Sequence, residues 1–248
     1  MDGFTYNNIF DTKGIEYLVI ITFFAILILF WIALNKQVQI RKRILKTHGP
    51  ITASALKIPQ GLFFSENHTW THLGRSGVAK VGLDDLLMHI TGEVNFNNLK
   101  NQGDKISKGD LLAEIDQNGK ILRILSPISG NIVDTNPVLA DNPGLLNEDP
   151  YQKGWMYEIR PTNWIGDTNS YYLAGAATKW IEKELEMFKD FLALSIGKLT
   201  PASPNIILQD GGEVSDHILS ELPDEVWQQF QEDFLSSNDS GTKHRKIA

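Results

Sequence analysis

The chain has 248 residues, of which 42% are hydrophobic and 21% are charged, and its net charge is -7. This acidic balance argues against a general nucleic-acid binder, and the length suits one medium domain or a small domain with appended segments. The absence of cysteine from the sequence excludes disulfides, thiolate catalysis, and zinc or iron–sulfur sites that use cysteine ligands.

The first patterned segment is an uncharged apolar run of 18 residues from Tyr17 to Leu34, preceded by a polar leader at 1–14 that we place outside the cytoplasm. A helix of this length crosses about 30 Å of hydrocarbon, so we predict a transmembrane helix over 15–35. A buried core helix is the alternative, but no polar face interrupts the run. A cleaved signal peptide fits poorly, because acidic residues precede the run and no small-residue cleavage site follows it.

Basic residues dominate the juxtamembrane segment at 36–55, which we expect to continue the helix at the membrane surface. They are Lys36, Arg41, Lys42, Arg43 and Lys46. By the positive-inside rule such residues stay cytoplasmic. This predicts a single-pass protein of the inner (cytoplasmic) membrane, with its N-terminus outside and its main domain in the cytoplasm. The cluster could also bind anionic lipid, although its role in topology already explains it.

Short strand-like runs separated by glycine, asparagine and aspartate fill the next segment, 56–163. The expected elements are strands at 77–82, 92–96, 130–134 and 155–159, and short helical turns at 83–89 and 142–147. Many short strands at close spacing predict a mainly β domain, built as a small sandwich or a flattened barrel.

The clearest turn in this domain is Asn118-Gly119, which lies between the apolar runs 111–115 and 121–125. Asparagine followed by glycine is the strongest short-range signal for a two-residue type I′ turn, because both central residues need a positive φ. We therefore predict a β-hairpin with Asn118 and Gly119 at its tip and Lys120 directly after it.

The pattern changes again after Pro161, and we expect a helical extension over 164–236, followed by a disordered tail at 237–248. Residues 176–196 are amphipathic, with apolar side chains at helical spacing. Further expected elements are a strand at 206–208, a helix at 216–222 capped by Ser215, and a helix opened by Pro223 that runs to Phe234.

The extension is rich in large aromatic side chains, whose role can be interpreted in two ways. These side chains are Trp180, Phe188, Phe191, Trp227, Phe230 and Phe234. They could pack on the β domain and on each other, or they could dock on partner subunits. The sequence leaves both interpretations open.

Several motifs of the β domain occur in the order and spacing of a known family. They include His68-Thr69-Trp70, Gly77 to Leu83, Gly92-Glu93-Val94, Gly103 to Ile115, Ser126-Pro127-Ile128-Ser129-Gly130, Asn147-Glu148-Asp149-Pro150-Tyr151 and Gly154-Trp155. Over 65–163 the chain resembles the glycine cleavage system H protein family. The resemblance implies a mainly β, hybrid-motif (barrel-sandwich) lipoyl-type domain, in which a lysine at a hairpin tip carries lipoate. The flanking segments would make this chain a membrane-anchored, divergent member with a C-terminal helical extension.

The lysine that this family modifies is missing at its own position. Aligned without gaps, the family's lysine falls at Gly119 and its upstream glutamate at Asp116, whereas Lys120 lies one residue further along. A shift of one residue turns a strand side chain to the other face, and we expect Lys120 to be a solvated lysine beside the turn. The sequence thus predicts a chain without lipoate or another cofactor. Alternatively, a gap would put Lys120 at the tip as the lipoyl-binding residue.

Other polar residues give no pattern for a catalytic or metal site. The six histidines show no metal-ligand spacing. His68 and His72 are four residues apart, which in a strand separates them by about 13 Å, and we interpret His68 as structural. The acidic pairs Asp84-Asp85 and Glu148-Asp149 lack a partner nucleophile and are typical of caps and loops.

Two functional hypotheses follow from these observations. In the first, the chain is a non-catalytic, membrane-anchored subunit that serves as scaffold or adaptor in a complex on the cytoplasmic face of the membrane, with a redox complex as one candidate. Its partners would be other subunits and the lipid bilayer, with no nucleic acid and no small-molecule substrate of its own. In the second, lipoate on Lys120 shuttles aminomethyl or acyl groups, or electrons, between enzymes.

Overall fold

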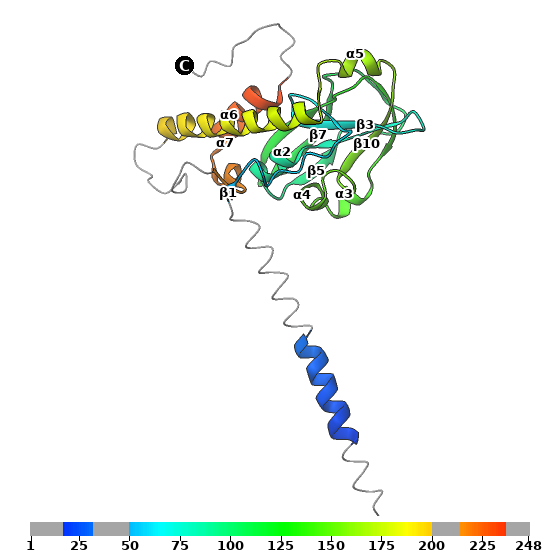
Figure 1. Cartoon of the computed structure of the whole chain (residues 1–248), viewed down its shortest axis with the longest axis vertical. Helices are drawn as coiled ribbons and strands as arrows, with labels where there is room; N and C mark the ends of the chain where they lie inside the picture. Colours follow the sequence, from blue (N-terminus) through cyan, green and yellow to red (C-terminus); the bar gives the residue numbers. More distant parts are fainter. Residues whose placement is uncertain (1–16, 32–49, 200–213, 237–248) are drawn as a thin grey trace, which may run out of the picture. The chain divides into compact units, whose positions relative to one another are not determined.

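The computed structural model of the chain describes residues 17–31, 50–199 and 214–236 (Figure 1). The chain divides into two units, 1–47 and 48–248. In the first unit, residues 17–31 are helical and expose their large apolar side chains. Within the three described ranges, no helix has both the length and the apolar character that a membrane crossing requires. The predicted transmembrane helix over 15–35 stays a prediction.

Several other predicted segments lie outside the described residues. They are the leader at 1–14, the juxtamembrane residues 36–49, the strand at 206–208 and the tail at 237–248.

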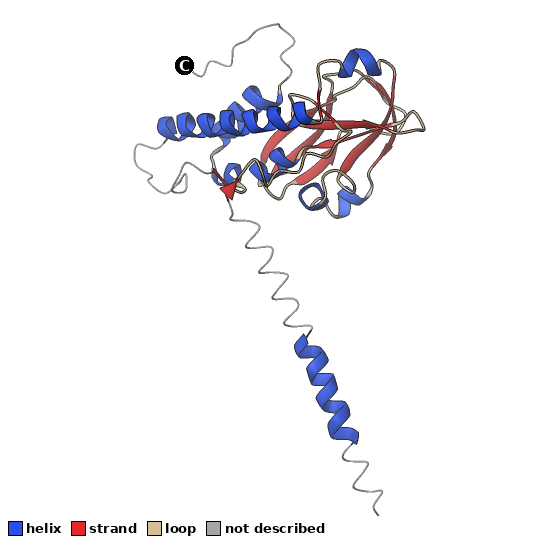
Figure 2. Ribbon diagram, viewed as in Figure 1, coloured by secondary structure: helices blue, strands red, loops and turns tan. Residues whose placement is uncertain are grey.

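The second unit is mainly β, as the spacing of its short strands predicts (Figure 2). A seven-stranded sheet has the order β11-β2-β3-β4-β10-β9-β6, and a three-stranded sheet has the order β5-β7-β8. The strands of the larger sheet are β2 (Phe63–Phe64), β3 (Thr69–Leu73), β4 (Ala79–Leu83), β6 (Lys105–Ile106), β9 (Gly130–Thr135), β10 (Trp155–Pro161) and β11 (Tyr172–Leu173). Those of the smaller sheet are β5 (Asn95–Asn98), β7 (Leu111–Gln117) and β8 (Lys120–Leu125).

A third, two-stranded sheet joins segments that are far apart in the sequence. It pairs β1 (Pro50–Ile51) with β12 (Val214–Ser215), and its strands are antiparallel like those of the larger sheets. The start of the domain is therefore hydrogen-bonded to the start of the last described segment.

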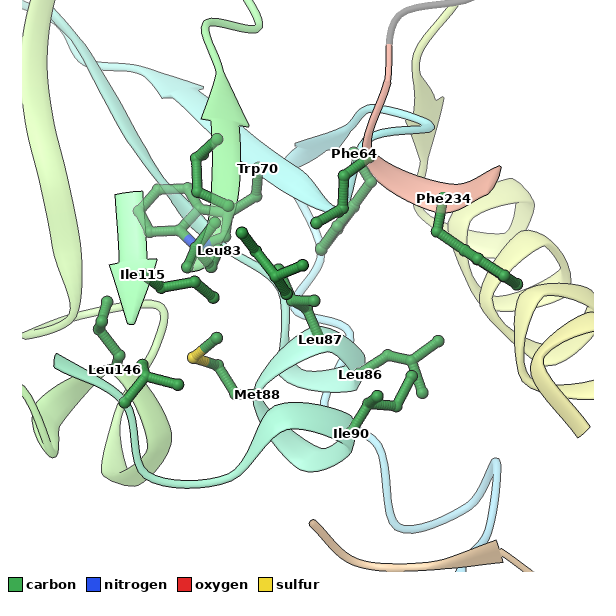
Figure 3. Close-up of a cluster of buried hydrophobic side chains, with 14 of the residues drawn as sticks. Phe64, Trp70, Leu83, Leu86, Leu87, Met88, Ile90, Ile115, Leu146 and Phe234 are labelled. Carbon is green, nitrogen blue, oxygen red and sulfur yellow. The ribbon is translucent and has the colours of Figure 1, made fainter. Parts of the chain in front are cut away.

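The core lies between the strands and a short helix, α2 (Asp85–Thr91) (Figure 3). Alternate residues of β4, among them Val81 and Leu83, are fully buried, as one face of a pleated strand requires. Trp70 of β3 packs so closely over Gly82 that a Cβ atom there would come within 2.6 Å of the indole ring. Glycine at position 82 therefore makes room for the largest side chain of this core.

Helix α2 begins two residues later than the sequence predicts, because Asp84 acts as its cap. The Asp84 carboxylate accepts a hydrogen bond from the Leu87 N–H at 2.8 Å. The predicted turn at 142–147 corresponds to α4 (Leu145–Glu148). The structure also has two short helices that the sequence does not predict, α3 (Val138–Asp141) and α5 (Trp164–Thr168).

The C-terminal extension packs into the same unit as the β domain. It contains α6 (Gly175–Leu199), the 3-10 helix η1 (Ile218–Glu221), α7 (Asp224–Phe230) and the π-helical turn η2 (Gln231–Leu235). The predicted helix at 216–222 is shorter, because Ser215 belongs to β12 and His217 adopts a left-handed conformation with φ 62°.

The aromatic residues of the extension are buried within the chain itself. All six, Trp180, Phe188, Phe191, Trp227, Phe230 and Phe234, belong to the hydrophobic core. The Phe188 ring lies 5.7 Å from that of Phe230 and 6.0 Å from that of Phe234, which joins α6 to α7 and η2 (Figure 1). Of the two interpretations of these aromatic side chains, the structure supports packing within the chain.

Candidate functional site at the β7–β8 hairpin

The hairpin that carries Lys120 has the predicted two-residue turn. Gln117 pairs with Lys120 in the ladder, which leaves only Asn118 and Gly119 in the loop. Their φ angles are 54° and 88°, the positive values that a type I′ turn requires. The Asp116 carboxylate accepts a hydrogen bond from the Gly119 N–H at 2.9 Å and fixes the turn from its upstream side.

Position 119, where the family's lysine aligns, faces open space. A Cβ atom built on Gly119 would have no heavy atom within 4 Å. A side chain there would thus project freely from the tip, although the left-handed backbone disfavours any residue other than glycine or asparagine. The tip therefore keeps the geometry for presenting a side chain, but the residue at this position has none.

Lys120 lies one residue further on, and the extension binds its amine. Its Nζ atom donates hydrogen bonds to the backbone carbonyls of Leu222, at 2.6 Å, and Ser220, at 3.1 Å. These carbonyls lie at the C-terminal end of η1, where backbone oxygens lack partners within the helix and carry partial negative charge. The Nζ atom also lies 5.8 Å from the centre of the Trp227 ring, within the range of a cation–π contact.

The prediction that Lys120 is a solvated lysine beside the turn is therefore wrong. Its side chain is partly buried, and its amine donates two hydrogen bonds to backbone carbonyls of the same chain. The one-residue shift away from the tip turns the amine toward the extension.

A glutamine of the extension also binds the outer edge of the hairpin. Strand β8 is the last strand of its sheet, so its outer backbone groups have no neighbouring strand. The Arg123 N–H donates to Gln231 Oε1 at 2.6 Å, and Gln231 Nε2 donates to the Arg123 carbonyl at 3.2 Å. The side-chain amide of Gln231 thus takes the place of a neighbouring strand.

An ion pair with α2 holds the beginning of segment 214–236. His89 Nδ1 lies 2.8 Å from Asp216 Oδ1, and His89 Nε2 lies 3.5 Å from Asp85 Oδ2. Burial lowers the pKa of His89, but the hydrogen bonds to Asp216 and Asp85 outweigh this effect and raise the pKa to about 9. The His217 N–H donates to the His89 carbonyl at 2.7 Å, which strengthens the same junction.

His68 has the structural role that the sequence predicts. It is buried, and its Nδ1 atom lies 2.8 Å from Asp84 Oδ2, while its ring packs 5.5 Å from that of Trp180. His72 is exposed and contacts the Gly61 carbonyl instead. Among the residues that the structure describes, no group of three histidine, aspartate or glutamate side chains could hold a metal ion.

Three of the four carboxylates in the acidic pairs, those of Asp84, Asp85 and Asp149, accept hydrogen bonds in caps and loops, as predicted. Asp84 caps α2 and binds His68, and Asp85 accepts a hydrogen bond from the Lys57 N–H at 2.8 Å. Asp149 accepts one from the Gln152 N–H at 3.1 Å. These contacts give each of the three carboxylates a structural explanation.

The sequence does not predict the groups that bind the hairpin. Two of them, at Ser220 and Leu222, are backbone carbonyls, which leave no side-chain signature. Gln231 is a single glutamine on a helical face and gives no signal either. Trp227 is the one member of the site that the sequence marks, through the aromatic side chains of the extension.

Comparison with known proteins places the hairpin in a family. The profile of the Glycine cleavage H-protein family matches residues 62–184. The segment that binds Lys120, 214–236, lies outside this match.

Curated relatives agree with the profile. The probable glycine cleavage system H protein of Thermococcus kodakarensis is 34% identical over 113 residues, which cover 46% of this chain and 84% of that protein. The glycine cleavage system H protein of Kocuria rhizophila is 39% identical over 104 residues, covering 42% of this chain and 81% of that protein. A crystal structure of the H protein from Mycobacterium marinum is 27% identical, with a TM-score of 0.40, and covers 42% of this chain and 87% of that one. The chain therefore belongs to the glycine cleavage H-protein family, whose members are carrier proteins rather than enzymes.

Proposed function

We propose that this chain is a non-catalytic, membrane-anchored H-protein-like subunit without lipoyl-lysine. It acts as scaffold or adaptor in a membrane complex on the cytoplasmic face, with a redox complex as one candidate. The observation that carries the proposal is the hairpin itself: the tip position holds Gly119, and the amine of Lys120 is bound by the carbonyls of Ser220 and Leu222.

Acylation of Lys120 would conflict with this arrangement. An ammonium group has three donors and a full charge, whereas the amide formed with lipoate has one N–H and no charge. Modification would weaken the charge-assisted hydrogen bonds to the two carbonyls, and an acyl chain would have to fit beside the Trp227 ring. A swinging arm also needs free space around its root, and Lys120 is partly buried.

The anchor rests on the apolar run from Tyr17 to Leu34. The described part of this run exposes its large apolar side chains over a whole helix, and such a surface is costly in water. The basic residues that follow it in the sequence favour a cytoplasmic location for the H-protein-like domain. In this orientation the domain would face the cytoplasm, where it could bind other subunits of a membrane complex.

The lipoyl carrier is the alternative function, favoured by the family membership and by the single-residue distance between Lys120 and the tip. In that case the lysine would carry lipoate and shuttle aminomethyl or acyl groups, or electrons.

Mass spectrometry of the protein purified from its own cells separates these functions. We expect the intact mass of the unmodified chain; an increment of lipoyl size that maps to Lys120 would contradict the scaffold. An H protein with lysine at its tip, purified from the same cells, is the positive control for an active lipoylation system. The Lys120→Arg variant controls the assignment of the site, because it keeps the charge and cannot be lipoylated.

Two further measurements test the anchor and the complex. After carbonate extraction the chain should stay with the membrane pellet; release into the supernatant would contradict the anchor. Detergent extraction at native expression should give a particle larger than one chain, and recovery as a lone monomer would contradict the adaptor role.

A further inference from the structure

The segment 214–236, which we call the cap, contacts the hairpin at the Lys120 amine. Ser220 and Leu222 provide the two carbonyl acceptors for Nζ. Trp227, which is buried, lies beside the same amine, and its Nε1 atom donates to the Leu219 carbonyl at 2.7 Å. This last bond connects α7 to η1 and thereby fixes the loop whose carbonyls bind Lys120.

The cap is anchored at its beginning and at its end. At its beginning, β12 pairs with β1, and Asp216 binds His89 of α2. The ring of His217 lies so close to Gly92 that a Cβ atom at position 92 would come within 2.6 Å of it. At its end, Phe230 and Phe234 pack against Phe188 of α6.

A reaction at the Lys120 nitrogen atom must therefore break its contacts with the cap. An acyl donor must approach the nitrogen atom itself, and two carbonyl oxygens and an indole ring already occupy its surroundings. A movement of the cap that frees the amine breaks polar contacts and uncovers Trp227. Local opening of such a well-packed segment is a minor population, which lowers the rate of any reaction that needs it.

We propose that segment 214–236 is a built-in cap that closes the Lys120 amine to acyl donors and to lysine-modifying enzymes. The cap lies outside the family match at 62–184, so it is a feature that this chain adds to the family domain. The inference rests on the proposed function, because it would explain why a lysine beside the hairpin tip carries no lipoate.

Pulsed acetylation tests the cap on the full-length chain in detergent, produced without lipoate so that every lysine starts unmodified. The probe is sulfosuccinimidyl acetate, and peptide mass spectrometry gives the labelling rate of each lysine. The internal standard is Lys153, which is exposed in the same domain. We expect Lys120 to react about tenfold more slowly than Lys153. Equal rates for the two lysines in the wild-type chain would overturn the proposal.

Two variants then show whether the cap is the cause of the protection. The double variant Asp216→Asn with Gln231→Ala weakens the cap at both ends and leaves the aromatic core intact. Trp227→Ala removes the ring beside the amine. Each should raise the rate at Lys120 by about threefold or more while the rate at Lys153 stays constant. Thermal unfolding identifies a variant that has lost its fold. If Trp227→Ala does not fold, the labelling rate of the double variant alone shows whether the cap protects Lys120.

The labelling rates and the native mass together distinguish a failure of the cap proposal from a failure of the proposed function. Slow labelling at Lys120 that is unchanged in every folded variant would overturn the cap and leave the scaffold standing. A lipoyl increment on the native protein, together with slow labelling of the unmodified chain, would overturn the scaffold and leave the cap as a barrier that the cell can open.

Discussion

Positions 119 and 120 of the hairpin are neighbours in the chain and have opposite surroundings. A Cβ atom at Gly119 would meet nothing within 4 Å, whereas the Lys120 amine meets two carbonyls and an indole ring. The difference shows that a shift of one residue, from the turn to the first position of β8, changes the surroundings of a side chain completely. The chain keeps the family domain, although the residue at the open tip position is a glycine without a side chain.

Among the variants at and around positions 119 and 120, removal of the Trp227 ring beside Lys120 should have the largest effect on the free energy of unfolding. Trp227→Ala deletes a fully buried side chain and leaves a cavity between α7 and the hairpin. We expect it to lower the free energy of unfolding by about 3 to 5 kcal/mol, measured by denaturant titration.

Trp164→Ala is the matched control, because Trp164 is only partly buried and packs on Phe63 instead. It should cost less, since less apolar area is lost from the core. An equal or larger cost for Trp164→Ala would mean that the cap contributes no more to stability than a peripheral contact does.

The pH dependence of stability tests the junction between the cap and α2. The folded pKa of His89, about 9, lies above its ordinary value of 6.5. Its protonated form therefore stabilises the fold fully below pH 6.5, and this contribution is lost as the pH rises from 6.5 through 9. At 1.36 kcal/mol per pKa unit the loss is on the order of 3 kcal/mol.

Chemical denaturation at a series of pH values measures this loss. The His89→Gln variant keeps a hydrogen-bonding side chain but has no charge to titrate, so its stability should not show the same fall over that interval. A wild-type profile that is flat between pH 6.5 and 9 would argue against a charged His89–Asp216 pair.

The two neighbouring positions also differ in how far the sequence predicts them. The turn at Asn118 and Gly119 follows from a local rule, because a type I′ turn requires positive φ at two consecutive residues. The partners of Lys120 lie 100 and 102 residues away, and they are backbone carbonyls that every residue possesses. A pattern in the sequence can indicate which side chain is present, but it does not indicate which carbonyl will approach it.

The same distinction holds for the rest of the fold. The amphipathic spacing at 176–196 predicts α6, since a helix buries one face at regular intervals. The burial of Trp180 and Phe188 within the chain depends on how α6 meets distant strands and the cap. Aromatic content by itself is equally compatible with a partner surface, so that choice required the structure.

Neutralisation of Lys120 should have an intermediate effect. Lys120→Met keeps an unbranched apolar chain beside Trp227 but leaves the carbonyls of Ser220 and Leu222 without the ammonium donor. We expect a loss of about 1.5 to 3 kcal/mol in the free energy of unfolding, the range for hydrogen bonds to charged groups. Lys153→Met, at an exposed site, should change it by less than about 0.5 kcal/mol. Equal values for the two variants would mean that the Lys120 amine is free in solution.

The smallest predicted effect concerns the open position itself. Gly119→Ala places a methyl group in free space, so the left-handed φ of 88° alone should determine its cost, about 1 to 2 kcal/mol. Gly175→Ala is a matched control, because a Cβ atom there also meets nothing within 4 Å and the residue begins helix α6, where alanine is preferred to glycine. Denaturant titration should show Gly119→Ala to be destabilising and Gly175→Ala to be neutral or stabilising. If both variants are neutral, the turn tolerates a side chain at its tip, and backbone strain does not explain why glycine stands where the family has its lysine.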